Sequence, residues 1–270
     1  MADTILVTGG TGVLGGAVTR RLLDDGARVR VLSRRTRRPE TVPDRVEWVV
    51  GDLATGAGLP EALDGVTAVV HCASDSRHWK SDIAAARRLF DVARTTGSPH
   101  LVYVSIAGVD RVPYGYYRAK LEVERLLEAS GLPWTVLRAT QFHDLVLTVA
   151  QWLARLPVVL VPAGVRTQPV DVAEVANRLA DLARNAPAGR VPDLGGPEAL
   201  TAADAVRALL RATGRRRTVV SVPLPGKTMR AVRRGGLLAP GQPVGGSFAD
   251  FLRHAPLGDR RYGAAQRSVR

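Results

Sequence analysis

The chain begins with a short apolar run that leads directly into a cluster of glycines. Residues 4–8, TILVT, are mostly β-branched and apolar, which is typical of a buried strand, and residues 8–15 read TGGTGVLG. Beyond this loop, apolar residues recur at helical spacing from Val13 to Leu23. A turn this tight between a strand and a helix needs backbone angles that glycine adopts at little cost. The start of the chain therefore predicts a strand, a glycine turn and a helix.

The glycine loop also has the spacing of a dinucleotide-binding site, because it contains both T-G-x-x-G-x-x-G and G-x-G-x-x-G. Gly9 is expected to make the turn, Gly12 to let the backbone approach a diphosphate, and Gly15 to let the helix pack on the strand. Amide N–H groups at the helix N-terminus would then hold the diphosphate, and a glycine turn without a ligand is the alternative. The residues expected to contact the cofactor here are Thr8, Gly9, Gly10, Thr11, Gly12, Val13, Leu14 and Gly15.

The alternation of strand and helix continues through the first half of the chain. Helical patterns are clearest at residues 83–96 and 116–130. Strand-like runs occupy residues 27–33, 46–52, 67–73, 100–106 and 134–140. Alternation of this kind builds right-handed βαβ units and a parallel sheet that is covered on both faces. We therefore predict an α/β fold with a doubly wound, Rossmann-type parallel sheet, which binds ligands at the carboxyl ends of its strands.

The regularity loosens after about residue 150, where strands and helices become shorter. Asp171 and Thr201 are placed to cap helices that extend to Arg184 and Thr213. Further strand-like runs occupy residues 158–162, 191–196 and 219–223. We expect a dinucleotide-binding region over residues 1–150 and a smaller substrate-binding and C-terminal region over residues 151–270, interleaved in one compact domain.

The end of the second strand indicates which nicotinamide cofactor is bound. An NAD site carries an acidic residue there, whereas this chain has Ser33, Arg34 and Arg35. Guanidinium groups bind a 2′-phosphate that a carboxylate would repel, so NADP(H) is expected in preference to NAD(H). Arginine is abundant in this chain, and a chance arginine at this position is the alternative. Gly51, Asp52 and Leu53 follow the third strand and are expected near the adenine, although Asp52 alternatively serves as a capping carboxylate.

Five motifs in order along the chain resemble one superfamily. They are TGGTGVLG, SRR after the second strand, GDL after the third, VSIAGVD after the fifth and YYRAK at the start of the next helix. Together they are similar to the short-chain dehydrogenase/reductase superfamily, and more narrowly to its atypical, NmrA-like branch of NAD(P)H-binding reductases, over roughly residues 4–200. The resemblance implies that Ser105, Tyr116 and Lys120 are the catalytic residues. It also implies that Lys120 holds the nicotinamide ribose.

The chemistry of carbonyl reduction accounts for such a set. A carbonyl that accepts hydride develops negative charge on oxygen, so a nearby acid must deliver a proton and Ser105 would donate a second hydrogen bond. Tyr116 and Lys120 lie four residues apart, on one helical face, where an ammonium favours the phenolate. Only three lysines occur in the chain, so a lysine here is more than a random basic residue. Two alternatives stay open: Tyr117 is the acid, or the tyrosines only pack and Lys120 is solvated beside Glu124.

Residues that follow the fourth and sixth strands would complete the site. Cys72, Ala73, Ser74, Ala139 and Thr140 are expected to contact the cofactor, and Arg77, Tyr117, Gln141, Phe142 and His143 the substrate. Arg138 is also expected on the substrate side. His71 is interpreted as a buried structural residue in preference to a cofactor contact. No metal is expected, because the histidines show no metal-ligand spacing.

The charge and the apolar composition limit the classes of partner that the protein can bind. The formal charge is +13, but residues 1–210 carry 25 basic and 23 acidic side chains, and the excess lies in residues 211–270. This arginine-rich segment lacks interleaved aromatic residues, which favours a solvated surface over a site for nucleic acid or an acidic partner. No apolar stretch is long enough to span a membrane, and Cys72 is the single cysteine. We expect a cytoplasmic monomer or homodimer that acts on a small molecule.

Together these features predict an NADPH-dependent oxidoreductase that transfers hydride to a carbonyl, quinone or conjugated small molecule, with a tyrosine as proton donor. The alternative is a non-catalytic redox sensor of the NmrA-like type, in which the cofactor sets the affinity for a partner. Epimerase, dehydratase or isomerase chemistry is a third possibility.

Overall fold

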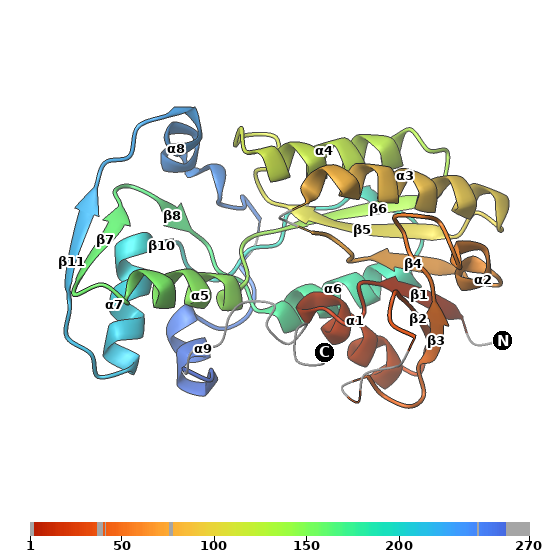
Figure 1. Ribbon diagram of the computed structural model, residues 1–270, viewed down its shortest axis with the longest axis horizontal. Helices are drawn as coiled ribbons and strands as arrows, with labels where there is room; N and C mark the ends of the chain where they lie inside the picture. The colour runs from red at the N-terminus through yellow and green to blue at the C-terminus, as the bar shows by residue number, and fades with distance from the viewer. Residues whose placement is uncertain (1–2, 37–39, 41, 76–77, 242, 258–270) are drawn as a thin grey trace. The chain divides into compact units, whose positions relative to one another are not determined.

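The computed structural model describes residues 3–36, 40, 42–75, 78–241 and 243–257. Its residue contacts divide the chain into two compact units that alternate along the sequence. Unit 1 comprises Met1–Ser105, Gly115–Arg138 and Val175–Pro192, and unit 2 comprises Ile106–Tyr114, Ala139–Glu174 and Asp193–Arg270. The elements of both units are labelled in Figure 1.

Unit 1 is built on a seven-stranded sheet with the strand order β3-β2-β1-β4-β5-β6-β9. The strands are β1 (Thr4–Thr8), β2 (Arg28–Ser33), β3 (Glu47–Val50), β4 (Ala68–His71), β5 (His100–Ile106), β6 (Trp134–Ala139) and β9 (Gly189–Arg190). The pairs β3-β2, β2-β1, β1-β4, β4-β5 and β6-β9 are parallel. The order reverses between β1 and β4, which is the switch point of a doubly wound sheet. The predicted Rossmann-type fold is confirmed.

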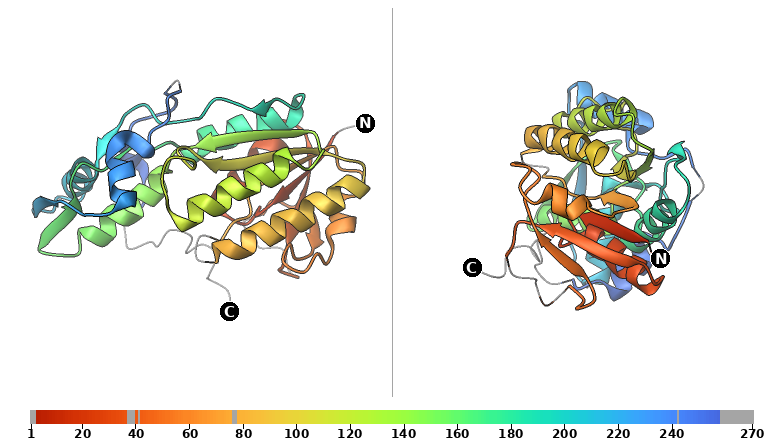
Figure 2. Two further views of the ribbon diagram at one scale, coloured as in Figure 1. Left: turned by 90° about the horizontal axis from the view of Figure 1, so that it is seen from above. Right: turned by 90° about the vertical axis from the view of Figure 1, so that its right-hand side faces the viewer.

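Helices cover both faces of this sheet, as expected when βαβ units alternate. The helices are α1 (Val13–Asp24), α2 (Leu59–Leu63), α3 (Trp79–Thr95), α4 (Gly115–Glu128) and α6 (Val172–Arg184). Figures 1 and 2 show α3 and α4 on one face and α1 and α6 on the other. The core on the first face includes Leu6, Leu89, Phe90, Leu101 and Leu127, all nearly excluded from solvent. The carboxyl ends of β1, β2, β4 and β5 are therefore held on a rigid base.

Unit 2 contains two small sheets and several helices. Its strands are β7 (Val158–Pro162), paired in parallel with β11 (Thr218–Val222), and β8 (Arg166–Thr167), paired antiparallel with β10 (Leu200–Thr201). Its helices are α5 (His143–Leu153), α7 (Ala202–Ala212), α8 (Lys227–Ala231), the π-helical turn η1 (Val232–Gly236) and α9 (Phe248–His254). A second apolar core, which includes Val159, Val206, Leu209 and Phe248, holds α5, α7, α9 and β7 together.

Most elements that the sequence predicted after residue 150 are present, with one correction. Thr201 caps α7 through a capping box with Asp204, and Asp171 accepts a hydrogen bond from the backbone of Ala173 just inside α6. The strand predicted at residues 191–196 is wrong, because only isolated bridges at Leu194 and Gly195 form there. Pro192, which has no N–H to donate, interrupts the ladder just beyond β9.

The helix α5 has no counterpart in the sequence predictions. It begins after Phe142 without a capping side chain, and the acidic Asp144 in its first turn is its one start signal. It is 11 residues long. Throughout the described ranges of the chain, every helix is too short or too polar to cross a bilayer.

Candidate cofactor and active site

The glycine loop after β1 is shaped by close backbone contacts. Gly9 has a φ of +71°, and a Cβ there would lie 2.8 Å from the backbone nitrogen of Ala73, just beyond β4. A Cβ at Gly15 would lie 2.2 Å from the carbonyl oxygen of Gly9, so the first turn of α1 packs on the loop itself. Gly12 caps α1 without a side-chain hydrogen bond. The first N–H groups of the helix are therefore left for an anionic ligand such as a diphosphate.

Replacing Gly15 with alanine is expected to weaken NADPH binding by at least about tenfold, because the new methyl group would push the loop away from α1. The carbonyl of Gly9 cannot withdraw without moving the amides beside it. Calorimetric titration with NADPH measures the effect. Gly16→Ala is the matched control, since a Cβ at Gly16 would meet its nearest backbone atom at 3.4 Å. Equal affinities for the two variants would contradict this account of the loop.

The carboxyl ends of β2 and β3 lie at the same edge of the sheet as the glycine loop, with β2 next to β1. Arg34 and Arg35 are exposed directly after β2, and the Ser33 hydroxyl accepts a hydrogen bond from the backbone of Arg35 at 3.1 Å. The Asp52 carboxylate accepts a hydrogen bond from the backbone of Ala54 at 2.9 Å, in the turn between β3 and α2. Gly51 and Leu53 also have structural partners. A Cβ at Gly51 would lie 2.5 Å from the oxygen of Ala57, and Leu53 packs against the core.

His71, at the end of β4, is buried between the glycine loop and β5. Its Nδ1 lies 2.7 Å from the Thr8 hydroxyl, and its ring stacks on Tyr103 with the ring centroids 5.6 Å apart. Burial, and secondly the charge of Lys120, lowers the pKa of His71 to about 3, so the imidazole is neutral. Burial likewise raises the pKa of Cys72 to about 12, so the thiol stays protonated. Neither group is suited to acid–base chemistry near neutral pH.

Lys120, on α4, lies over the rings of two tyrosines. It is 6% exposed, donates a hydrogen bond to the carbonyl oxygen of Val104 at 3.2 Å, and lies 4.8 Å from the ring centroid of Tyr103 and 6.0 Å from that of Tyr116. Burial alone would lower the pKa of Lys120, but interactions with Tyr103 and Tyr116 outweigh it and raise that pKa above its ordinary value. The lysine is therefore a buried ammonium. The alternative of a solvated lysine is wrong.

Tyr116 and Tyr117 have different surroundings. Tyr116 is half-buried, and its hydroxyl lies 3.0 Å from the hydroxyl of Ser74, which follows β4. Tyr117 is 9% exposed, and the two rings lie 6.5 Å apart between centroids. Ser105 is 4% exposed at the end of β5, and its hydroxyl has no hydrogen-bond partner in the part of the chain that the structure describes. The structure thus brings Ser74, Tyr116 and Lys120 together, and it leaves a buried donor at Ser105.

Comparison with known proteins places this chain in a family. Residues 9–185 match the family described as NAD(P)H-binding. This range includes the glycine loop from Gly9 onward, Tyr116, Tyr117 and Lys120. The chain belongs to this NAD(P)H-binding family. The match extends over most of unit 1 and includes the glycine loop and the N-terminus of α1.

Individual relatives of this NAD(P)H-binding chain include enzymes and an assembly factor. It is 35% identical to (4-alkanoyl-5-oxo-2,5-dihydrofuran-3-yl)methyl phosphate reductase of Streptomyces griseus, over 78% of the chain and 74% of that protein. It is 27% identical to the photosystem II assembly factor Ycf39 of Cyanophora paradoxa, over 82% and 72%. The fold is shared with an NADPH-dependent quinone oxidoreductase of Escherichia coli, solved with NADPH, at a TM-score of 0.78 and 21% identity over 93% and 99% of the chains.

The predicted site residues at the start of unit 2 are mostly engaged within that unit. The buried hydroxyl of Thr140 donates to the carbonyl of Gln168, and the side-chain oxygen of Gln141 accepts from Thr167 at 2.7 Å. His143 is 1% exposed and stacks on two phenylalanines of α9, and its burial lowers its pKa. Ala139 is buried at the end of β6, and Phe142 precedes α5. Arg77 lies outside the described residues.

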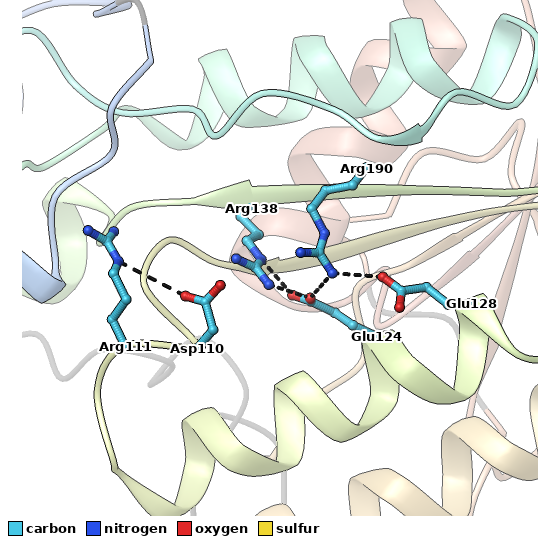
Figure 3. A network of polar contacts seen from close by, with 6 residues as sticks. All are labelled: Asp110, Arg111, Glu124, Glu128, Arg138 and Arg190. Carbon is cyan, nitrogen blue, oxygen red and sulfur yellow. Dashed lines mark hydrogen bonds and ion pairs between the residues drawn. The ribbon is translucent and has the colours of Figure 1, made fainter.

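A buried ion-pair network joins α4, β6 and β9 in this NAD(P)H-binding protein (Figure 3). The Glu124 carboxylate is fully buried and accepts two hydrogen bonds from Arg138, at 3.0 and 2.7 Å. Arg190 contacts Glu124 at 3.3 Å and Glu128 at 2.7 Å. Glu124 therefore pairs with arginines and not with Lys120, and the expectation that Arg138 lines the substrate side is wrong. The sequence contains one signal for this ion-pair network, which is the single arginine, Arg138, within a mostly apolar strand.

Proposed function

We propose that this protein is an NADPH-dependent oxidoreductase of the short-chain, NmrA-like kind, which transfers hydride to a carbonyl, quinone or conjugated small molecule. One observation carries the proposal: the Tyr116 hydroxyl lies 3.0 Å from that of Ser74, and the Tyr116 ring centroid lies 6.0 Å from the buried ammonium of Lys120, in a chain of the NAD(P)H-binding family. The Streptomyces relative, whose name is that of a reductase, supports reduction as the reaction type.

Each residue has a role that follows from its surroundings. When bound, the nicotinamide supplies the hydride. The amides at the start of α1 hold the diphosphate. The glycines of the loop leave no side chain between the backbone and the diphosphate. Tyr116 delivers a proton to the oxygen that gains negative charge, and the ammonium of Lys120 stabilises the phenolate that is left. Ser105, whose hydroxyl is buried without a partner in the described part of the chain, polarises the same oxygen.

The test is whether the purified protein oxidises NADPH when ketones, quinones and conjugated carbonyl compounds are supplied in turn. We expect turnover of at least one class, with product formed in equal amount to the NADPH lost. Binding of NADPH without turnover of any compound in the panel would contradict the proposed function.

Two arginines after β2 favour NADPH over NADH. Replacing both Arg34 and Arg35 with alanine is expected to weaken NADPH binding by about tenfold or more and to leave NADH binding nearly unchanged, because only NADPH carries the 2′-phosphate. Fluorescence titration with each nucleotide measures the difference. Arg28→Ala is the control, since Arg28 is exposed at the opposite end of the same strand. Equal losses for the two nucleotides would refute the assignment of these arginines to the phosphate.

A non-catalytic cofactor-binding protein is the second candidate, and it is favoured by the similarity to a photosystem II assembly factor. In that case the cofactor would set the affinity for a protein partner. The presence of both Tyr116 and Lys120 in one contact argues for the enzyme, since a sensor has no need of a proton donor. The substrate panel separates the two functions.

A further inference from the structure

A chain of hydrogen bonds extends from Tyr116 to a carboxyl group on the neighbouring helix. The Ser74 hydroxyl lies 3.0 Å from the Tyr116 hydroxyl and donates to Oδ2 of Asp82 at 2.6 Å. The three residues come from three segments of unit 1: the loop after β4, the first turn of α3 and the first turn of α4. A serine hydroxyl both donates and accepts, so Ser74 can pass a proton in either direction.

The fold fixes both ends of this chain. The two carboxylate oxygens of Asp82 each accept from the backbone N–H of Asp75 at 3.1 Å. The starts of α3 and α4 are held together by Trp79, because a Cβ at Gly115 would lie 2.9 Å from the Trp79 ring. Gly115 is the residue before Tyr116. The short distance between the carboxyl and the tyrosine therefore depends on backbone packing as well as on flexible side chains.

The burial of Asp82 favours its protonated form. Burial raises the pKa of Asp82, and this outweighs the opposing effects of the hydrogen bonds from Ser74 and Asp75 and of the charge of Lys120. The ionisable groups that face it are Asp75, which is paired with His78, on the loop before α3, and Tyr116 and Lys120 on α4. Asp82 therefore holds a proton at a higher pH than a surface aspartate, while its partial exposure lets solvent replace that proton.

We propose that Ser74 and Asp82 form a proton relay that restores the proton of Tyr116 after each reduction. The proposal rests on the oxidoreductase function proposed above. As the substrate carbon accepts hydride from the reduced nicotinamide, the O–H bond of Tyr116 breaks and its proton joins the substrate oxygen. The Ser74 proton then passes to the phenolate, and the Asp82 proton passes to Ser74. The carboxylate left on Asp82 is reprotonated by solvent. Ser74 and Asp82 act through Tyr116 and are positioning residues.

The first test does not require turnover. Carbon-13 NMR of labelled aspartate follows the titration of Asp82 in the wild type, in Ser74→Ala and in Tyr116→Phe. Loss of the Ser74 hydroxyl removes a donor to the carboxylate, so we expect the pKa of Asp82 to rise further, by about one unit. Tyr116→Phe is expected to move it by a smaller amount through Ser74. Asp91→Asn, an exposed residue of α3 paired with Arg94, should leave it unchanged. An unmoved pKa of Asp82 in the first two variants would overturn the relay.

The second test follows the rate with the best substrate of the panel. The relay supplies a proton only while Asp82 is protonated, so the wild-type rate should fall as the pH rises through the raised pKa of Asp82. Asp82→Asn should lose this pH limb and react about tenfold more slowly at low pH, with NADPH affinity unchanged. Asp82→Glu should restore part of the rate, and Asp91→Asn should match the wild type. A wild-type pH profile in Asp82→Asn would overturn the relay.

The two tests separate the relay from the proposed function. A wild type that reduces nothing, together with an Asp82 titration that responds to Ser74 and Tyr116, would overturn the oxidoreductase function while supporting the connected hydrogen-bond chain. An active wild type whose Asp82 ignores both substitutions would overturn the relay alone.

Discussion

Replacing Tyr116 with phenylalanine is expected to lower the rate of substrate-dependent NADPH oxidation by about 10²–10⁴-fold, the usual contribution of a general acid. The substitution removes one hydroxyl and keeps the ring, which lies 6.0 Å from the Lys120 ammonium, so the packing of α4 should persist. Because Tyr116 is assigned to proton delivery and not to the diphosphate, the affinity for NADPH should change little. The loss should therefore appear in kcat and not in cofactor binding.

Tyr117→Phe is the matched control for this prediction, since it removes the same hydroxyl from the adjacent position. Tyr117 is buried, whereas the hydroxyl of Tyr116 is the one that lies 3.0 Å from Ser74. We expect Tyr117→Phe to retain most of the activity. The reverse result, a large loss in Tyr117→Phe and little in Tyr116→Phe, would transfer the role of proton donor to Tyr117. An unaltered rate in both variants would rule out proton donation by either tyrosine.

Replacing Glu124 with alanine is expected to destabilise unit 1 by about 3–5 kcal/mol, the usual result when one partner of a buried ion pair is removed. Glu124 is fully buried, and Arg138, 5% exposed, donates two hydrogen bonds to it. Without the carboxylate, the guanidinium of Arg138 would remain buried in the sheet–helix layer and would lose the carboxylate that balances its charge. The free energy of unfolding in urea measures the loss.

The control for the buried pair is Glu128→Ala, which removes a partly exposed carboxylate that contacts Arg190 from the same helix. Exposed pairs contribute about 0–1 kcal/mol, so this variant should unfold close to the wild type. A double variant, Glu124→Leu with Arg138→Met, should recover much of the stability that the single substitution loses, because neither charge is then buried alone. A single Glu124→Ala variant as stable as Glu128→Ala would contradict the proposed role of the network.

Features that depend on local backbone geometry could be predicted from the sequence. The run TILVT became β1 and residues 100–106 became β5, with the predicted bounds, because strand periodicity and flanking turns are local signals. Thr201 capped its helix for the same reason. The i, i+4 spacing of Tyr116 and Lys120 likewise follows from the helix alone. By contrast, α5 escaped prediction because no capping residue marks its start.

The sequence by itself determined the Rossmann-type alternation, the glycine loop and the tyrosine–lysine spacing, since each depends on residues within a turn or two of one another. Only the tertiary structure decided the partners of those residues. Ser74 meets Tyr116 across 42 positions, and Arg190 meets Glu124 across 66. The strand order also places the Tyr103 ring against the Lys120 ammonium, and no sequence motif predicts this contact. Such contacts depend on how strands and helices pack, and packing brings together side chains whose separation in sequence carries no periodic signal.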